Sequence, residues 1–172
     1  MRLLPARVLA RAALIGATTG SRSFTGMAAL ALATPASAAT QPDRTLRKGW
    51  VKALVASGAL GELGADKLPA TPDRLAPRGL TGRVLMAALT GQTVARRQWP
   101  PRPGDPGPAD PDPVGEAAAA TAAAVAVGTA LAAAWLGSRW RRVAARHLGR
   151  DWPGAVLEDA AALSLAWAAV RS

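Results

Sequence analysis

The stretch Gly16–Ala33, GATTGSRSFTGMAALALA, decides the fold because it sets an arginine between two apolar runs. The run Val8–Thr19 precedes Arg22, and the run Phe24–Ala33 follows it. Glycine and serine beside the arginine favour the end of one helix and the start of another. The stretch therefore predicts two short helices that meet at a break, with a charged side chain inside the break.

The same region supports a second interpretation, as a signal peptide. A basic start leads to the apolar run Phe24–Ala33, and Ala36-Ser37-Ala38 matches the A-x-A pattern of a cleavage site. Cleavage there would leave a small exported protein. Two apolar runs around a charge instead favour a retained membrane segment, because a secretory signal has a single apolar region.

The composition favours lipid rather than water around these helices. Half of the 172 residues are apolar, alanine is the commonest of them, and aromatic residues make up 4% of the chain. A water-soluble core built mainly from alanine would lack the large side chains that fill space, whereas small residues let helices approach closely in a bilayer. Gly16 and Gly20 form a GxxxG pattern, which predicts close packing of the first helix against another helix.

The charged residues flank the apolar runs. The net charge is +10, and the positions of the arginines and lysines are typical of the flanks of membrane spans. Trp50, Trp135 and Trp140 stand where membrane-interface anchors are expected. The cations do not form a basic face with base-contacting side chains, so we expect no nucleic-acid partner. The chain has no cysteine, which excludes disulfides and thiolate chemistry.

The apolar segments predict an all-α fold, a polytopic helical membrane bundle with a broken first helix. A Pro- and Asp-rich linker at residues 99–113 divides the chain into an N-terminal membrane half, residues 1–98, and a C-terminal membrane half, residues 114–172. Gly-Ser-Arg occurs at residues 20–22 and again at 137–139, which suggests a weak internal repeat. The predicted helices are the broken helix 8–33, then 50–66 and 79–97 in the first half, and 115–147 and 153–171 in the second.

Four short motifs in a fixed order carry a resemblance to a known family. They are GSRSFT at Gly20–Thr25, ADKLP at Ala65–Pro69, Gly82-Arg83, and LEDAAAL at Leu157–Leu163. In this order they resemble the bacterial membrane proteins grouped as domain-of-unknown-function family 4126, over most of the chain except the linker. The resemblance implies an all-helical, multi-pass protein of the bacterial cytoplasmic (inner) membrane, and it supplies no activity, substrate or catalytic residue. The matching positions are Arg22, Phe24, Thr25, Asp66, Lys67, Pro69, Glu158 and Asp159.

The candidate polar site gathers charged and hydroxyl side chains in or beside the apolar segments. An arginine in mid-membrane costs about 2.5–3.5 kcal/mol, so Arg22 should face a partner or water. The helix that begins after Ser23 would also point backbone N–H groups into the break, a position that favours anions. We expect this site to serve the passage of a small solute or ion. Its candidate residues are Arg22, Thr25, Glu62, Asp66, Lys67, Glu158 and Asp159.

Two alternative interpretations give these residues a structural role and assign no transport to the protein. The charged groups can be structural ion pairs that hold the bundle together, and the protein can be a membrane scaffold or a partner subunit. No nucleophile–base pair, metal-ligand spacing or cofactor motif is visible, so we predict no enzyme, no catalytic residue, no metal and no cofactor. The expected partners are the lipid bilayer and a small solute or ion, and a homo-oligomer is left open.

Overall fold

The computed structural model describes residues 4–38, 41–65, 77–98, 113–148 and 152–171. Every regular element within these ranges is an α-helix, which confirms the predicted all-α fold class. The four helices predicted after the break are present, and their ends differ from the predicted ends by no more than two residues. The helices are α1 (Ala6–Ser21), α2 (Ser23–Leu32), α3 (Asp43–Leu46), α4 (Gly49–Ala65), α5 (Pro77–Gln98), α6 (Pro113–Leu148) and α7 (Trp152–Arg171).

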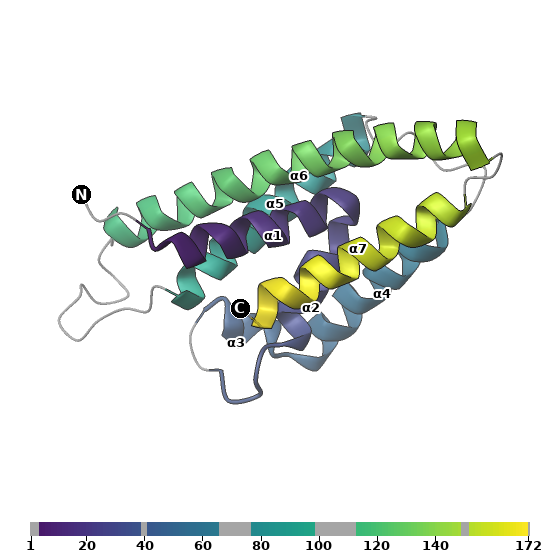
Figure 1. The fold of residues 1–172 in the computed structure, drawn as a ribbon. Helices are drawn as coiled ribbons and strands as arrows, with labels where there is room; N and C mark the ends of the chain where they lie inside the picture. The colour runs from purple at the N-terminus through teal and green to yellow at the C-terminus, as the bar shows by residue number, and fades with distance from the viewer. Residues whose placement is uncertain (1–3, 39–40, 66–76, 99–112, 149–151, 172) are drawn as a thin grey trace.

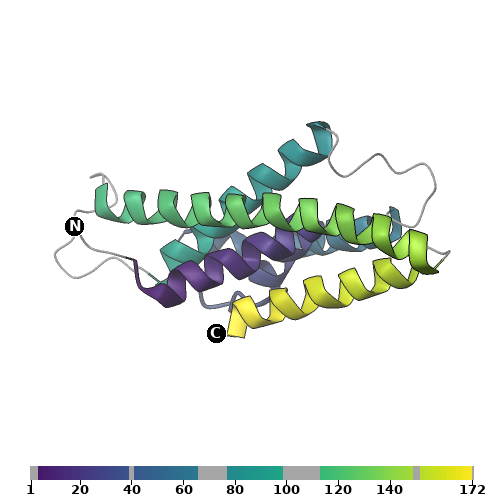
Figure 2. The same ribbon diagram turned by 45° about the horizontal axis from the view of Figure 1, so that its top comes forward.

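The central helix of the bundle is α1. It packs against α2, α5, α6 and α7, while α2 also packs against α4. Figure 1 shows the long helix α6 above α1, and α2, α4 and α7 below α1. In the turned view of Figure 2, α6 and α7 again lie on opposite sides of α1. The first helix of the chain is therefore surrounded by helices from the whole chain.

The break after α1 is a reversal of the chain. Arg22 is the single extended residue between the two helices, with φ −144° and ψ 109°. Beyond it, α2 turns back below α1 (Figure 1), so that Gly26 lies against Thr19 and Ile15. The sequence predicted a broken helix over residues 8–33, made of two short helices that meet at a break, and α1 and α2 are these two helices. The sequence did not predict how sharply the chain turns at Arg22.

The GxxxG pattern of α1 lies against α6, which confirms the predicted close helix packing. A Cβ atom built on Gly16 would lie 2.6 Å from the Cα of Ala126, and one built on Gly20 would lie 2.7 Å from the Cα of Ala130. Such distances leave no room for a side chain, so the two backbones are in direct contact. Small residues on both helices make this approach possible.

The core of the bundle draws on helices from both sides of the linker. Val8, Ala12 and Ile15 of α1 pack in one buried cluster with Val94 of α5 and residues of α2, α6 and α7. The two predicted membrane halves therefore share a core. The residues of the predicted linker before Pro113 lie outside the described ranges.

The second Gly-Ser-Arg of the predicted internal repeat does not interrupt a helix as the first one does. Gly137-Ser138-Arg139 lies inside the continuous helix α6, unlike the first Gly-Ser-Arg. The hydroxyl of Ser138 donates to the carbonyl of Trp135 at 2.7 Å, and the guanidinium of Arg139 lies 4.8 Å from the centre of the Trp135 ring. Both side chains thus find partners on their own helix, where no extended residue is needed.

Within the described ranges, α6 alone contains a segment long and apolar enough to cross a membrane, Gly115–Ala144. The helix α2 is apolar but shorter. One such helix gives weak support for a membrane location, because the core helix of a water-soluble protein meets the same criterion.

Candidate functional site

Three of the predicted site residues meet at the reversal between α1 and α2. Arg22 is buried, and its Nε donates to Oδ1 of Asp159 on α7 at 2.9 Å, while its Nη2 pairs with the same oxygen. Its Nη1 donates to the backbone carbonyl of Glu62 on α4 at 3.4 Å. The guanidinium therefore joins the reversal to two other helices. We call Arg22, Glu62 and Asp159 the Arg22 network.

The carboxylate of Glu62 lies at the N-terminus of α2. The backbone N–H groups of Ser23 and Phe24 donate to its two oxygens at 3.0 and 2.9 Å. These are N–H groups that a helix cannot satisfy internally, and a negative charge here also complements the helix dipole. The position that the sequence predicted for an anion is thus filled by the protein's own carboxylate.

Removing this carboxylate should loosen α2. We expect Glu62→Ala to lower the free energy of unfolding by about 1–2 kcal/mol, the usual cost of losing a helix cap. Glu116→Ala is the matched control, because Glu116 is an exposed acid in the first turn of α6. Denaturant titration of both purified variants measures the difference. Equal losses in the two variants would contradict the capping role.

Glu158 makes a separate ion pair. Its Oε2 accepts from Nε of Arg141 on α6 at 3.1 Å, and its side chain is 7% exposed. The neighbouring acids Glu158 and Asp159 therefore bind α7 to two different places, α6 and the reversal after α1. The sequence identified both acids but not Arg141, whose only signal was its place in the basic cluster at the end of α6.

The remaining predicted residues divide into two groups. Thr25 is buried in the first turn of α2, and its N–H donates to the carbonyl of Arg22 at 3.3 Å. Asp66 and Lys67 lie outside the described residues. The structure thus brings Arg22, Glu62 and Asp159 together, and the backbone N–H of Thr25 lies beside them.

Charged side chains also bind the C-terminal end of α2, which the sequence analysis missed. Nη2 of Arg97 donates to the carbonyl of Leu30 at 2.9 Å and to the hydroxyl of Thr34, while its Nε donates to Asp43 at 2.7 Å. Nζ of Lys52 donates to the carbonyl of Thr34 at 2.9 Å. α2 therefore has an acid at its N-terminus and cations at its C-terminus, as the helix dipole favours.

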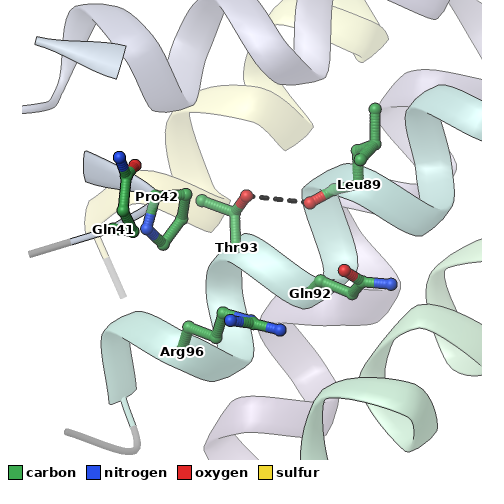
Figure 3. A pocket seen from close by; sticks show the side chains of 6 residues that line it. All are labelled: Gln41, Pro42, Leu89, Gln92, Thr93 and Arg96. Carbon is green, nitrogen blue, oxygen red and sulfur yellow. Dashed lines mark hydrogen bonds between the residues drawn. The ribbon is translucent and has the colours of Figure 1, made fainter. Parts of the chain in front are cut away.

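A small pocket of about 170 Å³ lies away from the Arg22 network, between α5 and the segment before α3 (Figure 3). The side chain of Thr93 contributes one wall, and its hydroxyl donates to the carbonyl of Leu89 at 2.8 Å. None of the lining residues belongs to the predicted polar site. They are Gln41, Pro42, Leu89, Gln92, Thr93 and Arg96.

The described part of the chain holds no group of three or more His, Asp or Glu side chains placed to bind a metal. The charged groups of the Arg22 network, together with Glu158 and Arg97, form ion pairs and helix caps that connect helices. Comparison of the chain with protein-family models, with curated proteins and with solved structures finds no match.

Proposed function

We propose that the chain is an integral membrane protein whose helices form a multi-pass bundle in the bacterial cytoplasmic membrane. The observation that carries the proposal is that the small apolar side chains are buried while many large ones are exposed. The buried apolar residues are mainly alanine, while Trp50 and Leu60 are 65% and 68% exposed. Exposed leucine or tryptophan side chains occur on α2, α4, α5, α6 and α7. Apolar surface this widespread suits lipid contact, since water-soluble monomers expose only limited apolar patches.

Helix length and tryptophan positions support the same proposal. A span of the hydrocarbon core needs about 20 residues, and α5 and α7 have 22 and 20 residues. Exposed Trp50 is near the start of α4 and exposed Trp167 is near the end of α7, and Figure 1 shows these two helix ends at the same end of the bundle. Trp135 and Trp140 are in the second half of α6. Tryptophan is enriched at both membrane interfaces.

The packing of α1 and α2 supports their retention in the mature protein. Cleavage after Ala38 would remove Val8, Ala12 and Ile15 from the core cluster and Gly16 and Gly20 from the α6 contact. The remaining helices would then lack their central element. This favours the membrane protein over the exported one.

Fractionation tests the proposal. The full-length chain should remain in the membrane pellet after a carbonate wash, which removes peripheral proteins, and its intact mass should include residues 1–38. A soluble marker protein expressed in the same cells controls for trapped material. A mature chain that begins near residue 39, or one that is monodisperse in detergent-free buffer, would overturn the proposal.

The Arg22 network supports a structural role, in which the protein acts as a membrane scaffold or partner subunit. The guanidinium of Arg22 and the carboxylates of Glu62 and Asp159 contact one another or a helix end. Groups occupied in this way hold α1, α2, α4 and α7 together. Breaking a buried ion pair is costly, so such groups fix the arrangement of helices.

A second candidate is transport of a small solute or ion. It is supported by a buried arginine at a chain reversal inside the bundle, since many transporters bind substrates at interrupted helices. Ion or proton flux into vesicles that contain the purified protein would favour this candidate. Flux no greater than in empty vesicles would leave the structural role.

We also propose that the chain is a divergent member of family 4126. Two of the motifs that carry the resemblance meet in space, because Arg22 of GSRSFT pairs with Asp159 of LEDAAAL. A contact between residues so far apart in sequence supports treating the motifs as parts of one pattern.

A further inference from the structure

The pocket beside α5 combines an apolar end with a cationic end. Leu89, Gln92, Thr93 and Arg96 follow one another at intervals of three, one and three residues and share one face of the helix. Leu89 is 51% exposed, and Arg96 lies about 10 Å further along the helix axis. Apolar contact and positive charge are therefore separated along the pocket.

The side walls of the pocket supply amide groups. Gln92 comes from α5 and Gln41 from the segment before α3, and Figure 3 shows them on different sides of the pocket. The hydroxyl of Thr45 donates to Oε1 of Gln41 at 2.9 Å, which holds this amide in place. Amide N–H groups donate to ester and phosphate oxygens.

The charge around the pocket is positive. The neighbouring acid, Asp43, is bound by Arg97, and no acidic side chain of the described residues forms an ion pair with Arg96. Arg44, Arg47 and Lys48 are exposed in and just after α3. The pocket lies between the C-terminal half of α5 and the segment before α3, at the end of the bundle where α4 begins and α7 ends (Figure 1). This is where a membrane interface would cross the bundle.

We propose that this pocket binds the phosphate-bearing headgroup of an anionic phospholipid. Arg96 binds the phosphate, the amides of Gln41 and Gln92 bind the neighbouring oxygens, and Leu89 contacts the start of an acyl chain. Guanidinium groups suit phosphate because several N–H donors point in one plane. The inference rests on the proposed membrane location, and it assigns this end of the bundle to a leaflet that contains anionic lipid.

Native mass spectrometry of the full-length protein in mild detergent tests the site. Phosphatidylglycerol should bind, whereas diacylglycerol, which has the same acyl chains without phosphate, should not. Arg96→Gln should weaken phosphatidylglycerol binding about fivefold, the effect of one arginine at a charged membrane surface. Arg7→Gln is the matched control, because Arg7 is an exposed arginine in the first turn of α1 that does not line the pocket.

Each outcome decides a different point. Equal weakening in the two variants would overturn the pocket and leave only general charge attraction. Displacement of the lipid by inorganic phosphate at equal concentration would overturn the lipid assignment, because the site would then take free phosphate. Membranes from the same cells are also washed with carbonate, and the washed membranes are tested for the presence of the chain. A chain that stays in the membrane but has no preference for phosphatidylglycerol overturns this inference alone, whereas a soluble chain overturns the proposed membrane location.

Discussion

Replacing Gly20 with alanine should destabilise the detergent-purified protein by about 1–3 kcal/mol, the usual cost of adding an atom to a filled contact. The new Cβ atom would lie 2.7 Å from the Cα of Ala130, closer than the 3.0 Å that real Cβ atoms keep from their neighbours. The atoms it meets belong to the backbone of α6, so α1 would have to move away. Titration with a denaturing detergent, followed by circular dichroism, measures the loss.

Gly128→Ala is the matched control for Gly20→Ala. Gly128 lies in α6, and a Cβ atom built there has nothing within 4 Å. The same substitution should therefore be neutral or should stabilise the helix by up to about 1 kcal/mol, because alanine is the better helix former. Similar losses at the two positions would contradict direct backbone contact between α1 and α6.

This contact was partly predictable from the sequence. The GxxxG spacing places Gly16 and Gly20 on one face of a helix, and that local geometry predicts a close neighbour. The pattern does not identify which helix fills the face. Ala126 and Ala130 lie in a long alanine run that offers similar small residues on every turn, so the register between α1 and α6 depends on the whole bundle.

The reversal after α1 shows a second limit of local sequence. Gly-Ser-Arg ends a helix at Arg22 but continues one at Arg139. The difference lies in distant partners, because Arg22 binds Asp159 and the carbonyl of Glu62, whereas Arg139 stacks on Trp135 of its own helix. A tripeptide contains no information about partners that lie 40 and 137 residues away along the chain.

The contacts of the candidate site were likewise only partly predictable from local sequence. The sequence identified Arg22, Glu62 and Asp159 because charged residues in apolar segments need partners. It did not identify the cap that Glu62 makes on α2, or the contacts of Arg97 and Lys52 at the other end of that helix. Those contacts depend on where α4 and α5 lie beside α2, which helix periodicity does not determine.

Removing one member of the Arg22–Asp159 pair should have the largest effect of all. We expect Asp159→Leu or Arg22→Met to cost about 3–5 kcal/mol each, because each leaves a buried charge without its partner. The side chains of Arg22 and Asp159 are only 4% and 14% exposed, so water compensates little. Denaturant titration in detergent measures both variants, and Arg171→Met is the control, since Arg171 is exposed and stacks on Trp167.

The double variant Arg22→Met/Asp159→Leu separates the structural role from transport. If the pair is structural, the double variant should cost clearly less than the sum of the single variants, because apolar residues of similar size can replace a buried ion pair. It should also remain in the membrane fraction. Additive costs would contradict the pairing of the two side chains. A double variant that recovers stability but loses a flux seen in the wild type would instead assign Arg22 and Asp159 to transport, since packing alone would then be restored without activity.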